Sequence, residues 1–403
     1  MNLKPTDFSK DRIGIKFRLG GGTLTLPKDK PALDMVAVTL MNDGGLEKHS
    51  SEDLRQIFAG KDVGFQFEAD DDSFEFKGST TREDLLTQLQ LMCAYLTNPG
   101  YRPDGLRPLL RQIDALYERM SHVPQGIMQR DVDPFLKSGD YRAGLPPKEA
   151  FAQRTVDEVK DWLSEPLKKA YLEVSLVGDL DPEEVIAACA KTVGALPERE
   201  ASKPDYAEAR KMAFPKGPVT KVFPYTSQIP KAMVALYWPT TDQSKIKLTR
   251  RLTILAEVLS DRIREKVREE LGDAYSPRAG HQASSTYKDY GSLVAQLTVK
   301  PEEAEKVAAV VSEIASGIAA NGTNKDELER VKKPLLTQIE ESRRTNGYWH
   351  SSVLDSCQEQ PYRLDWAKSM LEDFGGITVE EINALAKQYL DPSKEVQVIV
   401  TTE

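Results

Sequence analysis

The stretch TVDEV at residues 155–159, followed by LEVSLV at residues 172–177, decides how the chain is organised. The same pattern returns 223 residues later, as TVEEI at residues 378–382 followed by VQVIV at residues 396–400. In both copies the threonine suits a helix N-cap, and the acidic residues fall in the first turn, at the positive end of the helix. The apolar segment that follows predicts a strand. We therefore expect one helix–strand unit that occurs twice.

A second pair of features repeats at the same offset. Asn98-Pro99-Gly100 follows the helix predicted over residues 85–96, and Asn321-Gly322 follows the helix predicted over residues 304–320. Two matches at one separation indicate duplicated domains. Chance similarity is the alternative, because helix–strand units are common in proteins of every class.

The length of 403 residues also agrees with two domains of similar size. Residues 196–217 are rich in charge and proline, which predicts a linker. We therefore expect a first domain over residues 1–200 and a second over residues 215–403.

Short alternating segments define the fold class of each domain. FQFEA at residues 65–69 and FEFK at residues 74–77 alternate at period two around DDDS, which predicts a hairpin. Residues 276–283 and 291–297 predict the matching strands of the second copy, and residues 13–19 predict another strand. Strands joined by turns, with helices in blocks, favour an α+β fold. Each domain is then a mainly antiparallel sheet covered by helices on one face.

Composition excludes some classes of protein. Apolar residues make up 40% of the chain and charged residues 29%, the balance of a globular protein. The net charge of −9 is spread along the sequence without a basic block interleaved with aromatic residues, so we expect no nucleic-acid partner. No apolar run reaches the length of a membrane span, so we expect none.

Cysteine usage leaves the compartment open. Cys93, Cys189 and Cys357 are odd in number and far apart, which favours small buried apolar residues over a disulfide framework or a thiolate metal site. Such scarcity agrees with the cytoplasm or the periplasm. The residues after Met1 lack signal-peptide character and lead to a strand, so we expect Met1 to begin a cut-out fragment or a mature chain.

The helix predicted over residues 250–271 carries the candidate site. Leucine, isoleucine and valine recur along it at three- and four-residue steps and form one stripe, at Leu252, Leu255, Leu259, Ile263, Val267 and Leu271. Arg268 lies beside the stripe in the last turn, and Gly272 favours the helix end. Tyr275 begins the next strand, so the chain reversal can bring both side chains to one sheet edge. Spacing alone favours an ordinary arginine at a helix end and a packed tyrosine.

A resemblance makes this pair specific. VREELGDAYS at residues 267–276 is similar to the Arg…Tyr signature in the second half of insulinase/pitrilysin-type zinc peptidases. YKDYG at residues 287–291 resembles the segment that enters the next strand in that family. KPTDF at residues 4–8 and NGYW at residues 346–349 resemble its long bacterial zinc-protease branch. The resemblance covers nearly the whole chain, and it implies a pair of similar α+β domains.

In that family one half carries a His-x-x-Glu-His zinc motif with a distant Glu ligand, and the other half lends its Arg and Tyr. The resemblance therefore implies a non-catalytic half, in which Arg268 and Tyr275 bind the substrate carbonyl and stabilise the transition state. Zinc is expected in a catalytic partner half, fused upstream or separate, and the substrate is an unfolded peptide. The resemblance also suggests the periplasm. A non-enzymatic peptide-binding or structural scaffold of the same fold is the alternative.

A zinc site in this chain is not expected. The nearest approach to the inverted motif is His49-Ser50-Ser51-Glu52-Asp53, where Asp replaces the second His. The helix predicted over residues 109–120 has no clear Glu at the place expected for the third ligand, where residues 110–114 read LRQID. We interpret His49, Glu52 and Asp53 as a degenerate remnant, or as a loop before a helix that Ser51 caps. Metal binding by His49 and Glu52, with a self-sufficient chain, is a third hypothesis.

We expect structural roles for the remaining histidines and for two tryptophans. His122, His281 and His350 are isolated from one another in the sequence, which indicates surface or partly buried polar residues. Trp238 and Trp349 are expected to pack in the core or in a chamber wall.

Overall fold

The computed structural model describes residues 1–271 and 277–402, without the side chains of residues 268, 270 and 271. Contacts divide the chain into two compact units, each assembled from three stretches. Unit 1 comprises Met1–Asp114, Pro146–Ala209 and Glu340–Lys368; unit 2 comprises Ala115–Leu145, Arg210–Ile339 and Ser369–Glu403. Each unit therefore takes one segment from the other half of the sequence. The boundaries expected at residues 200 and 215 stay a prediction.

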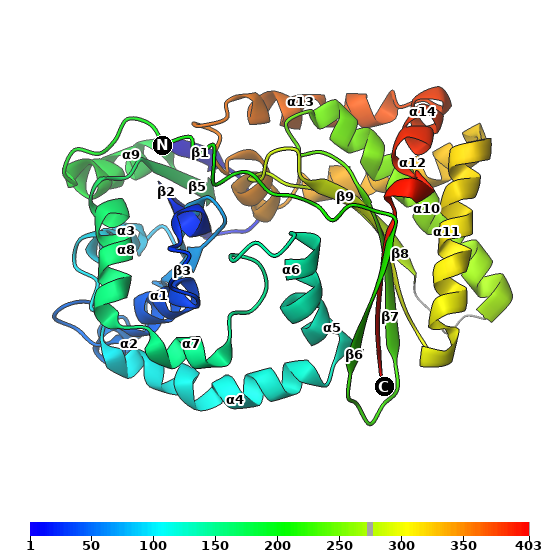
Figure 1. Ribbon diagram of the computed structural model, residues 1–403. Helices are drawn as coiled ribbons and strands as arrows, with labels where there is room; N and C mark the ends of the chain where they lie inside the picture. The colour runs from blue at the N-terminus through cyan, green and yellow to red at the C-terminus, as the bar shows by residue number, and fades with distance from the viewer. Residues whose placement is uncertain (272–276, 403) are drawn as a thin grey trace. The chain divides into compact units, whose positions relative to one another are not determined.

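Each unit contains a five-stranded sheet, and the two sheets have equivalent strand orders (Figure 1). The order is β1-β5-β2-β4-β3 in unit 1 and β6-β10-β7-β9-β8 in unit 2. The first strand of each order runs parallel to its neighbour, and the other pairs are antiparallel. This confirms the α+β fold with mainly antiparallel sheets. The strands are β1 (Asn2–Pro5), β2 (Ile13–Gly20), β3 (Gln66–Ala69), β4 (Ser73–Thr80), β5 (Leu172–Gly178), β6 (Val219–Tyr225), β7 (Ala232–Pro239), β8 (Arg278–Ala283), β9 (Gly291–Val299) and β10 (Val396–Thr402).

Period-two alternation builds the core of unit 1. Ile13, Ile15, Phe17 and Leu19 of β2 are fully buried, because every second side chain of a strand points to the same face. On that face Phe74 meets Trp162 of a covering helix edge to face, with ring centroids 5.0 Å apart. The helices of unit 1 are α1 (Leu33–Asp43), α2 (Ser51–Ile57), α3 (Leu85–Thr97), α7 (Lys148–Gln153), α8 (Val156–Lys169) and α9 (Pro182–Lys191).

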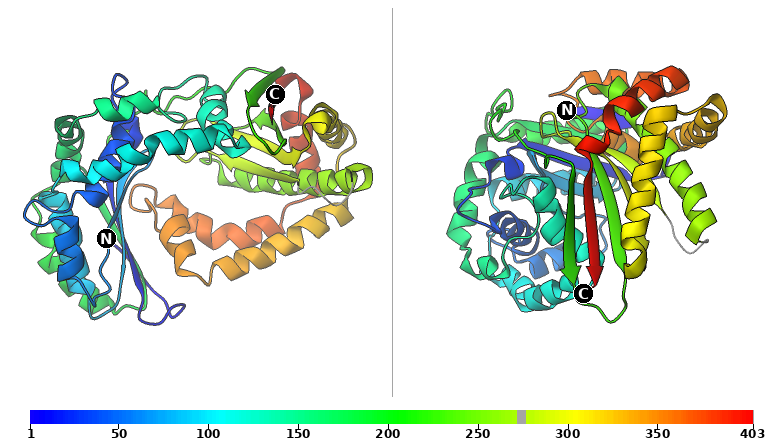
Figure 2. Two further views of the ribbon diagram at one scale, coloured as in Figure 1. Left: turned by 90° about the horizontal axis from the view of Figure 1, so that it is seen from below. Right: turned by 45° about the vertical axis from the view of Figure 1, so that its right-hand side comes forward.

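Three helices cover one face of the sheet in unit 2: α10 (Ile246–Leu271), α11 (Ala304–Asn321) and α14 (Val379–Tyr389). The right-hand view of Figure 2 shows α11, in yellow, alongside the strands. The predicted stripe of α10 is buried at Leu252, Leu255, Leu259, Ile263 and Val267, and the helix begins four residues before the predicted start. Trp238 is fully buried in this core, as expected.

The repeated signals seen in the sequence are confirmed at atomic level. Thr155 and Glu158 form a capping box at the start of α8, and Thr378 and Glu381 form another at the start of α14. Strands β5 and β10 follow these helices, and β3 pairs with β4 as the predicted hairpin.

Segments that cross between the units cover the second face of each sheet, whereas the sequence predicted cover on one face only. In unit 2 this segment contains α5 (Pro124–Ile127), a π-helical turn (Met128–Val132) and α6 (Asp133–Leu136). In unit 1 a π-helical turn (Tyr348–Val353) lies against β5. Three helices contribute residues to both units: α4 (Arg107–Ser121), α12 (Lys325–Ser342) and α13 (Tyr362–Gly375).

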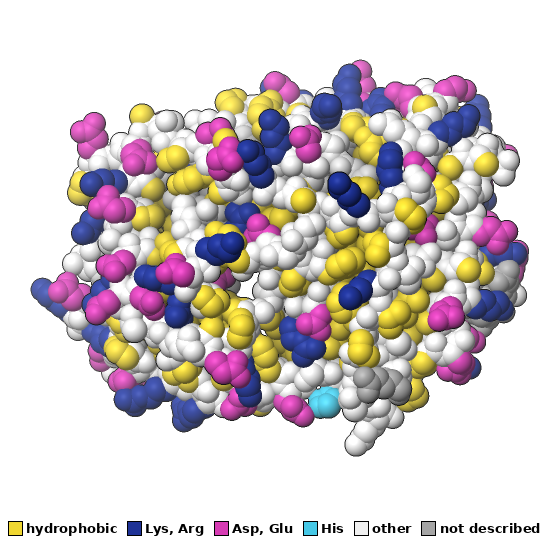
Figure 3. Space-filling view, viewed as in Figure 1, with side chains coloured by type: hydrophobic (Ala, Val, Ile, Leu, Met, Phe, Trp, Pro, Cys, Tyr) yellow, Lys and Arg dark blue, Asp and Glu magenta, His cyan; other side chains and the backbone are white. Residues whose placement is uncertain are grey.

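On the face drawn in Figure 3, basic and acidic side chains are interspersed and form no basic tract. Within residues 1–271 and 277–402, none of the helices combines the length and apolar character that a membrane crossing needs.

Candidate functional site

The C-terminal end of α10 carries the first member of the predicted pair. Val267 is buried in the core, and Arg268 is the next residue of the helix, so its backbone belongs to the last turn. A cation in this position complements the negative end of the helix dipole. The side chain of Arg268 lies outside the described part of the structure.

Tyr275 lies in residues 272–276, which are also outside the described part. The chain is described again from residue 277 and enters β8, the last strand in the order of the unit 2 sheet. In the sequence, Arg268 precedes the connection between α10 and β8, and Tyr275 falls within that connection. Their convergence on one spot stays a prediction.

Strand β8 offers backbone groups next to this connection. It pairs with β9 on one side, from Arg278 opposite Gln296 to Ala283 opposite Gly291. A strand at the end of a sheet presents a row of N–H and C=O groups that an extended peptide can pair with. In the same strand the Nε2 atom of His281 lies 3.1 Å from Thr240 Oγ1, and burial lowers the pKa of His281 to about 4. This histidine is therefore neutral near pH 7.

A groove of about 310 Å³ is lined by residues of α10, from Arg262 to Glu269, and by residues of α11. Its charged lining residues are Arg262, Glu265, Lys266 and Glu269 of α10, Glu313 of α11, and Glu327. Arg262 Nε and Nη2 donate to the two carboxylate oxygens of Glu327 at 3.0 and 2.9 Å, which holds the pKa of Glu327 down to about 2. Four carboxylates and two cations therefore line the groove, and its net charge is negative.

The stretch expected as a degenerate zinc motif is occupied by structural hydrogen bonds. Ser50 is the N-cap of α2, one residue before the predicted Ser51, and it forms a capping box with Asp53. The Ser50 hydroxyl, followed by its backbone N–H, lowers the pKa of Asp53. Glu52 pairs with Arg55, and His49 is exposed. Helix capping therefore explains this segment.

Arg102 fixes the loop that leads to His49. Its Nη1 donates to the carbonyl oxygens of Gly44 at 2.8 Å and His49 at 3.0 Å, and also to that of Leu46. Its Nη2 donates to Glu47 O at 2.8 Å. A guanidinium in the middle of the loop disfavours a second cation there.

The described residues do not fit a zinc ion. None of the His, Cys, Asp and Glu side chains within residues 1–271 and 277–402 forms a group of three that could hold a metal. In the helix predicted to carry the third ligand, α4, Asp114 is exposed and pairs with Lys148 at 2.9 Å. No chemical step is therefore assigned to a metal in this chain.

The other polar candidates take structural places. His122 Nε2 lies 2.9 Å from Glu118 Oε1, and the carbonyl of Thr226, followed by Glu118, raises the pKa of His122. The Trp349 indole donates to Arg343 O at 2.9 Å. Cys93, Cys189 and Cys357 are free thiols, and burial raises the pKa of each, as for small packed side chains.

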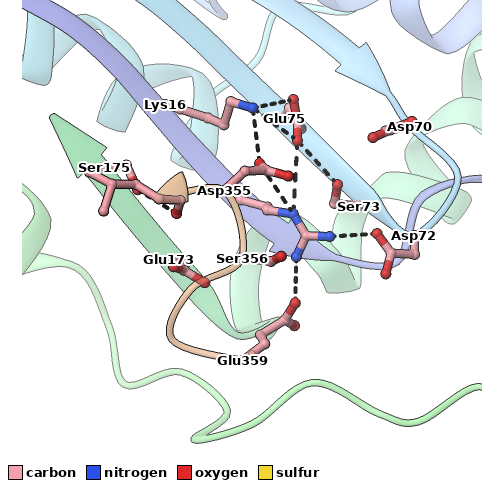
Figure 4. Close-up of polar contacts among 12 residues, drawn as sticks. Lys16, Asp70, Asp72, Ser73, Glu75, Glu173, Ser175, Asp355, Ser356 and Glu359 are labelled. Carbon is pink, nitrogen blue, oxygen red and sulfur yellow. Dashed lines mark hydrogen bonds and ion pairs between the residues drawn. The ribbon is translucent and has the colours of Figure 1, made fainter. Parts of the chain in front are cut away.

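Sequence reasoning missed a layer of charged side chains buried in unit 1, around Lys16 and Arg18 of β2. Figure 4 shows Lys16 of this layer beside Glu75. The signal that could have found it is the strand IGIKFRLG, where cations stand at the positions opposite the apolar face.

The chain is similar in sequence to a known protein family. Residues 154–335, which include Arg268 and Tyr275, match the family described as "Peptidase M16 inactive domain". The chain is similar to the chloroplastic stromal processing peptidase of Oryza sativa subsp. indica, with 20% identity over 432 residues. That alignment covers 95% of this chain and 34% of the relative, so the chain spans about a third of the relative's length.

Two solved structures share the fold. The peptidase M16 inactive domain from Pseudomonas fluorescens has a TM-score of 0.80 and 18% identity, over 97% of this chain and 93% of that chain. The periplasmic protease PqqL from Escherichia coli has a TM-score of 0.76 and 18% identity, over 99% of this chain and 44% of that chain. The family match and the shared fold confirm the resemblance that residues 267–276 indicated.

Proposed function

We propose, on the premise that residues 154–335 match the inactive domain of M16 peptidases, that this chain is the non-catalytic half of a zinc metalloendopeptidase. It binds peptide substrate for a zinc-bearing partner half. The observation that carries the proposal is the position of Arg268, in the last turn of α10, directly before the connection to the edge strand β8.

The chemistry needs donors that meet charge as it develops. A zinc ion held by the partner half would supply Lewis-acid chemistry at the scissile carbonyl. When the carbonyl is attacked its oxygen gains negative charge, and a cationic or phenolic donor aimed at that oxygen stabilises the transition state selectively. Arg268 and Tyr275 supply these donors, and the Arg268 fork also holds a substrate carbonyl in register. Strand β8 offers an extended peptide a sheet edge to join.

The partner half is a second polypeptide or a segment of the same one. The shares of 34% and 44% that this chain covers in its relatives support either arrangement, because each relative has room for a further half. A scaffold of the same fold is the alternative function. It has no chemical need for an Arg and a Tyr at this spacing.

Replacing one hydroxyl tests the proposal in the enzyme assembled with its catalytic half. Tyr275→Phe should lower kcat by about tenfold to about a thousandfold, as for loss of an oxyanion donor, while zinc content stays normal. Tyr141→Phe is the matched control, because Tyr141 is an exposed tyrosine of the same unit. Unchanged turnover of Tyr275→Phe would refute the role. Absence of zinc-dependent peptide cleavage by the assembled wild type would favour the scaffold.

A further inference from the structure

The duplicated sheets differ in the chemistry of their second faces. At the offset of 223 residues, Glu173 and Ser175 of β5 correspond to Val396 and Val398 of β10. The two strands occupy the same place in the two strand orders. Two polar residues in unit 1 therefore stand where unit 2 has valines.

The pairing registers extend this correspondence to the central strands. In unit 1, Arg18 pairs with Glu173 and Lys16 pairs with Ser175. In unit 2, Tyr237 pairs with Val396 and Ala235 pairs with Val398. Arg18 thus occupies the place of Tyr237, and Lys16 that of Ala235.

The next strand follows the same rule. Glu75 of β4 pairs with Arg18, and Val294 of β9 pairs with Tyr237. In unit 1 all of these face positions are nonetheless buried, with exposed fractions of 7% for Lys16 and Arg18, 3% for Glu75 and 2% for Glu173. The second face of the sheet is therefore buried in both units, but it is charged in unit 1 and apolar in unit 2.

Different covers meet the two faces. In unit 2, Ile127 and Val132 of the crossing segment pack on Ala235, Tyr237 and the valines of β10 in one apolar cluster. In unit 1 the cover is residues 346–359, which we call the strap. Its Tyr348, Val353, Leu354 and Cys357 side chains are buried. Figure 4 shows that its Asp355 and Glu359 carboxylates also lie among the charged groups of this face.

Two ion pairs join the strap to β2. Lys16 Nζ lies 3.0 Å from Asp355 Oδ1, and Arg18 Nη1 lies 2.5 Å from Glu359 Oε2. Lys203, from the stretch between β5 and β6, lies 3.4 Å from the same Glu359 oxygen and 2.8 Å from Asp72. The strap thus places two carboxylates beside three cations whose side chains are almost completely buried.

Hydrogen bonds and one cation–π contact add to the attachment. Thr6 Oγ1 donates to Asn346 Oδ1 at 2.6 Å, at the start of the strap. Lys4 Nζ lies 4.3 Å from the ring centroid of Trp349. Near its end, the Gln358 backbone N–H donates to Glu173 Oε1 at 3.0 Å.

The free energy of the charged part of this attachment differs from that of apolar cover. Docking the strap removes charged groups from water, and that desolvation cost cancels much of the attraction between them. When the strap leaves, each charge is hydrated again, so the exposed face of Lys, Arg and Glu is stable in water. Exposing the valines and tyrosine of unit 2 would instead cost the full hydrophobic term.

We propose that the strap is a releasable cover of unit 1, whereas residues 124–136 are a permanent anchor of unit 2. Release exposes a sheet face of mixed charge and frees Trp349 with its segment. The local opening of the strap does not depend on the proposed function. Its role as a gate that admits a peptide to this face rests on the proposed function.

Hydrogen–deuterium exchange of the wild-type chain tests the opening directly. Salt screens charges that are exposed in water and so favours the undocked state, which makes NaCl at about 0.05 M and about 1 M the comparison. Protection of residues 346–359 should fall by about tenfold at the higher salt, while that of residues 124–136 changes by less than about twofold. Equal responses of the two segments, or none in the strap, would overturn the proposal.

A charge-removing variant gives the second measurement. Asp355→Asn with Glu359→Gln leaves Lys16 and Arg18 without their strap partners, so exchange in the strap should rise by at least about tenfold at low salt. Asp365→Asn is the matched control, because its pair with Lys368 lies on α13 with both side chains 77% exposed. Unchanged exchange of β7 and β9 reports that the fold is intact. A strap that exchanges as in the wild type overturns the proposal, whereas peptide binding and the Tyr275→Phe result report separately on the proposed function.

Discussion

Replacing His350 should remove the pH dependence of strap docking. His350 belongs to the π-helical turn Tyr348–Val353. Its Cε1 and Nε2 atoms lie 3.9 Å from where a Cβ on Gly14 would stand. Its Nε2 is buried, with no hydrogen-bond partner among the described residues. Burial, followed by the charge of Lys16, lowers the pKa of His350 to about 4, against the opposing effects of the Ser175 backbone, Asp355 and Glu75.

The direction and size of the pH effect on strap docking follow from the number of protons that the docked and undocked states bind. The undocked histidine has a pKa of about 6.5, so the undocked strap binds more protons than the docked strap between about pH 6.5 and about pH 4. Docking is fully favourable above that window and weakens as the pH falls through it. Between about pH 7.5 and about pH 5.5 the docking constant should fall by about tenfold, or about 1.4 kcal/mol.

Hydrogen exchange corrected for its intrinsic pH dependence measures this change. Wild-type protection of the strap should fall by about tenfold over this interval, and that of His350→Gln should stay within about twofold. His281→Gln is the control, because His281 has a similarly lowered pKa but belongs to unit 2. Equal pH responses of the wild type and His350→Gln would refute the reasoning.

Three further predictions concern stability and are checked by urea unfolding. Thr378→Ala and Thr155→Ala should each lower the free energy of unfolding by about 1 kcal/mol, since each removes a capping box; no effect from either would contradict this. Glu327→Gln should cost about 1–3 kcal/mol of unfolding free energy at neutral pH, because the Arg262 partner stabilises only the ionised carboxylate. The variant should then lose less stability than the wild type as the pH falls from about 4.5 to about 2. The same acid profile in both proteins would count against this prediction. Trp238→Ala should cost about 3–5 kcal/mol, as for a large side chain lost from a core, whereas Val222→Ala, at a half-exposed position, should be nearly neutral.

The features that could be predicted from the sequence are those that local pattern determines. The threonine caps at residues 155 and 378, the hairpin around residues 70–73 and the stripe of α10 all depend on neighbours within a few positions. Each is present in the structure with small shifts of boundary. The family signature at residues 267–276 was equally local, and the match over residues 154–335 includes it.

What could not be predicted depends on partners distant in the chain. Lys16 and Arg18 resemble the solvent-facing residues of an ordinary strand, because the strap that buries them begins 330 residues after Lys16, at Asn346. The parallel strand β1 was missed because Asn2–Pro5 is too short and polar to signal a strand until β5 is beside it. Ser51 was chosen as the cap over Ser50 because either serine satisfies the local pattern.

The exchange of segments has a consequence for how the protein is made. A ribosome delivers the chain from its N-terminus, and early domains begin to fold during translation. The sheet of unit 1 can close once β5 has emerged, yet its second face must wait in water until residues 346–359 follow. Unit 2 has the opposite history, since residues 124–136 precede all of its strands. During synthesis the charged face of unit 1 is therefore exposed until its cover is made, whereas the cover of the apolar face of unit 2 is made before that face. This order of synthesis disfavours aggregation.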